Sequence, residues 1–215
     1  MRHQVMVIGL GRFGQAVARE LADLGHEVLA IDNDERMVND IAPAVTHALE
    51  LDATDEVALR AAGAADFQHA IVAISSHTEA SIFATMALRK LGVTNVIAKA
   101  ANGLHGEILE RVGATRVVYP EREIGQRVAH MFSVPEVVDY LDVAPSFGIQ
   151  KVRPPAKWVG RTLADLDLLG TLKLTPIAIR RGDRVQVDPP LSHQVEATDE
   201  LILIGLDDHL EGIAD

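Results

Sequence analysis

The fold of this chain is decided by the stretch Gly9-Leu10-Gly11-Arg12-Phe13-Gly14. An apolar run over 5–8 precedes it and a helical pattern over 15–24 follows. A second apolar run over 27–31 then ends in Asp32, 18 residues beyond Gly14. Strand, glycine-rich turn, helix, strand and acid in this order are typical of a dinucleotide-binding unit, although a glycine motif alone is weak evidence.

Each part of this stretch has its own predicted role. Gly9 permits the tight turn, Gly11 lets the backbone approach a pyrophosphate, and Gly14 lets the helix pack close to the strand. The N–H groups at the start of the helix then face the phosphates. Asp32 accepts hydrogen bonds from the two ribose hydroxyls. The alternative is a glycine-rich turn in an α/β protein that binds no nucleotide.

The composition predicts an ordinary core in one large or two small domains. The chain has 215 residues, of which 48% are hydrophobic, 24% charged and only 4% aromatic. A core that is mostly aliphatic suits a parallel sheet covered by helices. The absence of cysteine excludes disulfides, thiol nucleophiles and Cys-ligated metals. Because no apolar run approaches the ~20 residues of a membrane span and no signal peptide precedes the first strand, we expect a cytoplasmic protein.

The net charge of −11 is spread along the chain. Residues 1–140 carry 12 basic and 19 acidic side chains, or −7, and residues 141–215 carry 8 and 12, or −4. Neither part offers a basic stripe, so we expect no nucleic-acid partner. The local cluster Lys151, Arg153, Lys157 and Arg161 is interpreted as a solvated face.

Short apolar runs alternate with helical patterns up to about residue 133. The predicted strands are 5–8, 28–31, 45–49, 70–74, 96–99 and 116–119, and the predicted helices are 15–24, 35–41, 56–62, 79–91, 105–112 and 122–132. Six such units with short connections indicate a Rossmann-like, doubly wound parallel sheet of order 3-2-1-4-5-6. A ligand is then expected at the carboxyl ends of strands one and four.

The pattern changes after this region. Residues 134–141 suggest a helix break and a second short helix, and 163–169 suggest a small helix ended near Gly170. Two short strands flank Arg181-Gly182-Asp183, and 201–205 forms another strand. We therefore predict three segments: a nucleotide-binding domain over 1–133, a helical linker over 134–144, and a small α+β domain over 145–215.

Polar residues at the predicted strand ends supply further candidates. Arg12 lies within the glycine loop, where it faces the phosphates or is an exposed arginine at a helix start. Asp52-Ala53-Thr54 follows strand three, and Ser75 follows strand four; the threonine and the serine are equally candidates for helix caps. Lys99 ends strand five and is expected at the same edge of the sheet.

No catalytic constellation is visible in the sequence. The histidines are scattered, and no two have the spacing of a metal-binding or acid–base pair on one helix. The roughly 70 residues after the first domain are few for the substrate domain of a nicotinamide dehydrogenase.

Together these features resemble the RCK family, the cytoplasmic regulators of bacterial potassium uptake of the KtrA and TrkA types. The resemblance covers nearly the whole chain, and the length favours the KtrA type over the tandem TrkA type. It rests on the glycine loop 9–14, the strand and acid over 25–32, Ala98-Lys99-Ala100, Tyr119-Pro120-Glu121, Pro176-Ile177-Ala178-Ile179-Arg180, and Asp199-Glu200-Leu201.

The resemblance implies that the first domain binds ATP or ADP, or NAD(H) as in some members. In this reading Arg12 reaches the γ-phosphate and Glu121 holds Mg²⁺ or Ca²⁺; the alternative for Glu121 is an acid that complements the helix dipole. The implied nucleotide contacts are Gly9, Gly11, Arg12, Phe13, Gly14, Asp32, Asn33, Asp52, Ala53, Thr54, Ser75 and Lys99.

The resemblance also implies a regulatory role without turnover. Dimers formed through the helix over 122–132 would close into an octameric ring beneath a membrane potassium transporter of the KtrB or TrkH type, and nucleotide exchange would gate it. Some relatives bind cyclic di-AMP in the carboxy-terminal domain. The alternative function is a small NAD(P)-dependent oxidoreductase, which uses the same glycine motif.

Overall fold

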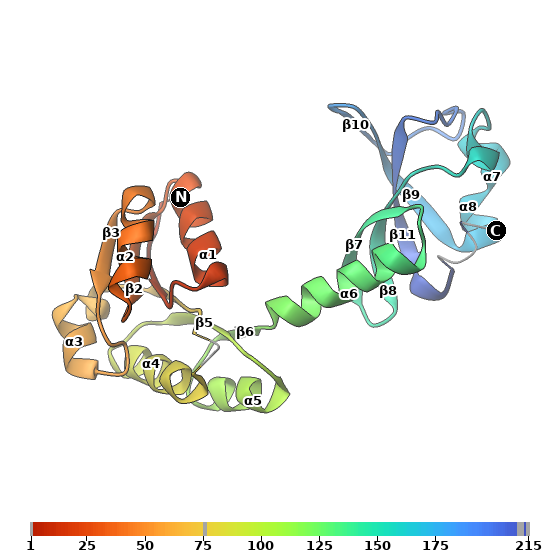
Figure 1. Cartoon of the computed structure of the whole chain (residues 1–215). Coiled ribbons are helices and arrows are strands. Elements are labelled where there is room, and N and C mark those ends of the chain that lie inside the picture. The colour runs from red at the N-terminus through yellow and green to blue at the C-terminus, as the bar shows by residue number, and fades with distance from the viewer. Residues whose placement is uncertain (1, 75–76, 210–212, 214–215) are drawn as a thin grey trace. The chain divides into compact units, whose positions relative to one another are not determined.

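The computed structural model describes residues 2–74, 77–209 and 213 (Figure 1). Contacts within the chain divide it into two compact units, Met1–Pro120 and Glu121–Asp215. Each unit has its own sheet and its own hydrophobic core.

The first unit contains a six-stranded parallel sheet. Its order is β3-β2-β1-β4-β5-β6, as the sequence predicts. The strands are β1 (Gln4–Ile8), β2 (Glu27–Asp32), β3 (His47–Glu50), β4 (His69–Val72), β5 (Asn95–Lys99) and β6 (Arg116–Val118). The chain reverses its direction of winding between β1 and β4, so their carboxyl ends form the crevice in which such sheets bind ligands.

Helices cover both faces of this sheet (Figure 1). They are α1 (Arg12–Asp23), α2 (Glu35–Ile41), α3 (Glu56–Ala61), α4 (Thr78–Lys90) and α5 (Gly103–Arg111). Ala18 of α1 and Ile41 of α2 pack with Val7 on one face. Leu59, Leu88 and Leu109, from α3, α4 and α5, contribute to the core on the other. Strands buried on both sides account for the continuous apolar runs in the sequence.

Helix α6 (Pro120–Ser133) begins at the division between the two units. None of its residues is buried, and Ile124, Val128 and Met131 form an exposed apolar stripe with the i, i+4, i+7 spacing of one helix face. Within the second unit, Arg127 of α6 forms an ion pair with Asp139, with Nε 2.5 Å from Oδ1.

The second unit contains a five-stranded antiparallel sheet of order β10-β9-β11-β8-β7. Its strands are β7 (Val137–Ala144), β8 (Phe147–Val152), β9 (Leu174–Arg181), β10 (Arg184–Val187) and β11 (Asp199–Leu206). Helices α7 (Leu163–Leu166) and α8 (Leu168–Leu172) supply Leu163, Leu166 and Leu168 to its core. A parallel Rossmann-like sheet followed by a small α+β unit confirms the predicted fold class.

Two local predictions are wrong. The segment predicted to be a helix within 134–144 forms strand β7, which pairs with β8 from Val137 to Ala144. Its β-branched and aromatic residues suit a strand once β8 supplies an antiparallel partner. The helix predicted over 163–169 is two short helices, because Asp167 adopts a left-handed conformation with φ +41° between them.

Candidate functional site

The glycine loop joins β1 to α1 through a close contact between Gly9 and Gly14. Gly9 has φ +90°, a conformation that L side chains rarely adopt. A Cβ on Gly14 would lie 1.8 Å from the Gly9 carbonyl oxygen, so only glycine allows the helix to approach the strand this closely. A Cβ on Gly11 would meet no atom within 4 Å, so open space lies in front of the second glycine.

The amino-terminal turn of α1 has no side-chain cap. Gly11 is its N-cap and, being glycine, has no side chain that could accept a hydrogen bond from the first turn. In contrast, Asp34 caps α2, Asp55 caps α3 and Asn102 caps α5 through carboxylate or amide oxygens. Uncapped N–H groups at the positive end of a helix dipole form a site for an anion such as a phosphate.

Asp32 ends β2 and contacts the glycine loop directly. One carboxylate oxygen accepts a hydrogen bond from the backbone N–H of Leu10 at 2.6 Å, and the other accepts from Asp34 N–H at 2.9 Å. Each oxygen keeps a lone pair for a further donor, such as a ribose hydroxyl. The sequence predicts the ribose contact but not the bond to Leu10, which positions the loop.

Lys99 and Phe13 come together across the sheet edge. Lys99 is 5% exposed at the end of β5, and its ammonium lies 5.4 Å from the centre of the Phe13 ring. This is a cation–π distance. The contact links the glycine loop to β5 and places a positive charge beside the loop.

The other predicted contacts fall at or near the carboxyl ends of β2, β3 and β4. Asn33 and Asp52 are exposed, whereas Ala53 is buried. Oδ1 of Asp52 accepts from both the N–H and the hydroxyl of Thr54, and these bonds hold the pKa of Asp52 below its ordinary value. Thr54 is therefore not the cap of α3, a role that Asp55 fills. Ser75 lies outside the described residues.

Arg12 and Glu121 are both exposed at the starts of helices, Arg12 on α1 and Glu121 on α6. A carboxylate is the kind of hard oxygen ligand that Mg²⁺ and Ca²⁺ require. No group of three metal-ligating side chains suited to one ion occurs in the part of the chain that the structure describes. A cation held by Glu121 would therefore need nucleotide phosphates or water for its remaining ligands.

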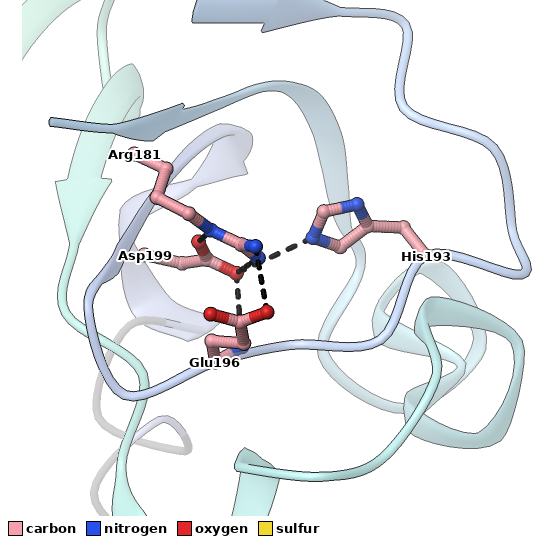
Figure 2. Close-up of polar contacts among 4 residues, drawn as sticks. All are labelled: Arg181, His193, Glu196 and Asp199. Carbon is pink, nitrogen blue, oxygen red and sulfur yellow. Dashed lines mark hydrogen bonds and ion pairs between the residues drawn. The ribbon is translucent and has the colours of Figure 1, made fainter. Parts of the chain in front are cut away.

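A cluster of charged side chains also lies in the carboxy-terminal unit (Figure 2). The buried carboxylate of Asp199 accepts from Nε of Arg181 at 2.6 Å and from the Glu196 N–H at 2.9 Å, and lies 3.3 Å from the ring of His193. Burial alone would raise the pKa of Asp199, but these hydrogen bonds outweigh burial and hold the pKa below its ordinary value. The charged groups of the cluster pair with one another, so we interpret the cluster as an ion-pair network that holds β9 to β11. We call Arg181, His193, Glu196 and Asp199 the clasp.

The geometry and the domain order define a class of protein. Residues 5–120 match the model of the TrkA-N domain, and residues 151–215 match the model of the TrkA-C domain. The chain therefore belongs to the family of proteins built from these two domains. Among 2–74, 77–209 and 213, no helix is long and apolar enough to cross a lipid bilayer.

Individual relatives narrow the family to potassium uptake proteins of the Ktr type. The chain is 38% identical to Ktr system potassium uptake protein C of Bacillus subtilis over 95% of this chain and 93% of the relative. It is 34% identical to protein A of the same system, over 94% and 91%. The chain belongs to this family.

Solved structures agree with the fold. The RCK domain of the GsuK channel matches 98% of this chain and 46% of that chain, with a TM-score of 0.69 and 18% identity. The GsuK channel has also been solved bound to NAD, at a TM-score of 0.54 and 24% identity over 98% of this chain and 38% of that chain.

Proposed function

We propose that this chain is the regulatory subunit of a potassium uptake system and that its first unit binds an adenine nucleotide. The family supports the potassium uptake role, and it favours a regulator over a small NAD(P)-dependent oxidoreductase. The observation that carries nucleotide binding is the uncapped start of α1, which lies beside open space at Gly11 and is bonded to Asp32 through Leu10.

The proposed binding mode follows from these groups. The phosphates lie against the first turn of α1, and Asp32 accepts from the ribose hydroxyls through its remaining lone pairs. ATP and ADP are the proposed ligands, with NAD(H) as the alternative, which suits the NAD complex of the GsuK channel. Phe13 and Lys99 close the β5 side of the loop.

Regulation requires that the ligand bind two conformations with unequal affinity. ATP and ADP differ only at the terminal phosphate, so the discriminating groups must recognise that phosphate. We assign this role to the exposed cation of Arg12 and to a Mg²⁺ or Ca²⁺ ion held by Glu121. The chain itself carries out no chemical turnover in this scheme.

Assembly is the second part of the proposal. The exposed apolar stripe of Ile124, Val128 and Met131 on α6 suits a dimer contact, and four such dimers would close an octameric ring. The ring would act on a membrane potassium transporter of the KtrB or TrkH type from its cytoplasmic side. Cyclic di-AMP binding by the carboxy-terminal domain stays a prediction, whereas the structure divides the chain after Pro120 and places β7 in the second sheet, in place of the predicted limits at 133 and 144.

The nucleotide proposal is tested by calorimetric titration of the purified chain with ATP, ADP and NADH. Asp32→Asn removes the charge but not the volume, and it should weaken ATP and ADP binding by at least about tenfold. Asp167→Asn removes the same charge from the cap of α8 in the second unit and should leave affinity unchanged. Equal affinities in the parent and Asp32→Asn would reject Asp32 as the ribose acceptor.

Repeating the titration with Mg²⁺ or Ca²⁺ tests Glu121. Glu121→Gln should abolish any effect of the cation on ATP binding and leave cation-free binding and the oligomer intact. A retained cation effect would make Glu121 a helix-start acid only. Turnover of NADH with a small substrate would instead support the oxidoreductase.

A further inference from the structure

Three histidines meet at the amino ends of neighbouring parallel strands. His3 immediately precedes β1, His26 immediately precedes β2, and His69 begins β4. The strand order β2-β1-β4 places β1 between the other two. The register pairs Gln4 with Glu27, so His3 and His26 occupy adjacent positions at the start of their strands. We call His26, His3 and His69 the histidine row.

The imidazole rings of the row are in contact. The centre of the His3 ring lies 5.5 Å from that of His26, in a stacked arrangement, and 4.9 Å from that of His69, edge to face. Two imidazoles that share one zinc ion at Zn–N distances of about 2.0–2.1 Å have their ring centres about 5 Å apart. All three histidines are partly exposed, so an ion could reach them from solvent.

The hydrogen bonds around the rings show what binding would change. Nδ1 of His69 lies 3.1 Å from the side-chain amide of Asn95. In the structure the Asn95 nitrogen faces Nδ1, and the Asn95 oxygen accepts from the Thr115 hydroxyl at 2.9 Å. The amide must therefore turn over and give up that bond before its oxygen can accept from Nδ1–H and Nε2 can serve as a ligand. Nδ1 of His26 accepts from the backbone N–H of His3 at 3.1 Å, so the neutral ring carries its proton on Nε2 and His26 must give up this bond to bind a metal.

The charged groups beside the row do not compete for the imidazoles. Glu27 follows His26, and its carboxylate is held by Arg2 at 3.4 Å and by the side chain of Gln4 at 2.9 Å. Among the residues that the structure describes, no histidine of the row forms an ion pair with a carboxylate. In the described part of the chain, no carboxylate therefore competes with a metal ion for the ring nitrogens of the row.

We propose that the histidine row binds one divalent transition-metal ion of the imidazole-preferring class, such as Zn²⁺, Ni²⁺ or Cu²⁺. In the described part of the chain no three donors converge on one point as they stand, so the rings must rotate to form the site. His3 and His69 supply the first pair of ligands, and His26 supplies the third. The five residues of β1 separate this row from the glycine loop by about 15 Å.

The test is a calorimetric titration of tag-free protein with Zn²⁺ and with Ni²⁺ at pH 7.5. We expect one ion per chain and a higher midpoint temperature of unfolding in its presence. His3→Gln and His69→Gln should each lower the affinity by about tenfold or more. His47→Gln, a change at an exposed histidine outside the row, should have no effect.

Three results would overturn the proposal: no saturable binding, equal affinity in the parent and both row variants, or the same loss in His47→Gln. ATP affinity serves as the control for folding and should be unchanged in each variant.

Discussion

The two units use their polar groups in different ways. In the amino-terminal unit, the first turn of α1 has no cap and Gly11 faces open space. In the carboxy-terminal unit, the charged groups satisfy one another: Asp199 with Arg181, and Glu200 with Lys151 at 2.9 Å and Arg180 at 3.0 Å. Open donors favour a ligand, whereas satisfied ion pairs favour rigidity. The comparison supports the proposal that a nucleotide binds at the glycine loop of the first unit.

The largest test of this comparison is a pair of glycine substitutions in the first unit. Gly14→Ala puts a Cβ 1.8 Å from the Gly9 oxygen and should cost about 4 kcal/mol or more of unfolding free energy. Gly11→Ala meets open space and should cost less than about 1 kcal/mol. Urea denaturation measures both.

ATP titration of the same two variants separates folding from binding. Gly11→Ala should stay folded but lose affinity, since its Cβ occupies the path proposed for the pyrophosphate. Equal stability of the two variants would contradict the close contact at Gly14. Full ATP affinity in Gly11→Ala would make the loop a turn only.

The next test addresses the clasp in the second unit. Asp199→Asn removes a buried charge and should cost about 2–4 kcal/mol, less than a fully buried pair because Arg181 is partly exposed. The folded-state pKa of Asp199 is lowered, so its contribution is present above the unfolded pKa of about 3.9 and is lost as the pH falls through the folded value. The parent should thus lose more stability than the variant below about pH 4.

Unfolding midpoints of both proteins from pH 6 to pH 2.5 check this. Glu56 offers a control, because it forms surface ion pairs with Arg60 at 3.1 Å and Lys90 at 2.6 Å, and Glu56→Gln should change stability much less than Asp199→Asn does. If the unfolding midpoints of the parent and Asp199→Asn fall equally as the pH is lowered, the ionised Asp199 does not stabilise the second unit.

A smaller effect is expected for Arg12→Ala. The side chain is exposed at the start of α1, so its removal should leave stability unchanged. ATP affinity should fall by about tenfold, the value of one charge-assisted hydrogen bond, while ADP affinity stays nearly constant. Parallel titrations with both nucleotides measure the ratio. Equal losses for the two would place Arg12 on the phosphates that ATP and ADP share.

The smallest predicted effect is on stability, and it concerns a buried polar side chain of the second unit that is not paired as the charged groups there are. Gln150 of β8 is fully buried, and neither its amide oxygen nor its amide nitrogen has a hydrogen-bond partner among the residues that the structure describes. Gln150→Leu removes this unsatisfied group and should raise stability by about 1 kcal/mol, as measured by urea denaturation. A loss of stability would show that the amide has a favourable role that the contacts do not reveal.

Much of the fold follows from local sequence signals. The apolar runs and the glycine loop predict the parallel sheet and its order, because each signal lies within one strand-helix unit. Strand β7 could not be predicted in this way, because it is a strand only when paired with β8. The turn that joins the two strands has φ +57° at Ser146, a conformation that a serine in the sequence does not signal. The pattern of β7 alone does not alternate cleanly between buried and exposed positions.

In the candidate site too, local features could be predicted from the sequence, whereas contacts between distant residues could not. Gly9, Gly14 and Asp32 are predicted because their roles depend on short spacings. The contact of Lys99 with Phe13 joins residues far apart in sequence, and the histidine row needs the register of three strands. Thr54 and Asp55 are adjacent, and the side chain of either could cap α3. Asp55 is the cap because the Thr54 hydroxyl donates its hydrogen bond to Asp52 instead.

In the proposed binding mode, the hydrogen bond from Leu10 to Asp32 makes the contacts to the sugar and to the phosphates interdependent. The carboxylate proposed to hold the sugar also fixes the backbone that faces the phosphates, so disturbing one contact shifts the other. Free-energy losses from Asp32→Asn and Gly11→Ala should therefore not add in the double variant. If the two contacts are coupled in this way, the sugar and the phosphates of a nucleotide bind cooperatively. A fragment such as inorganic phosphate should then bind with less free energy than the phosphate contacts contribute in the whole nucleotide.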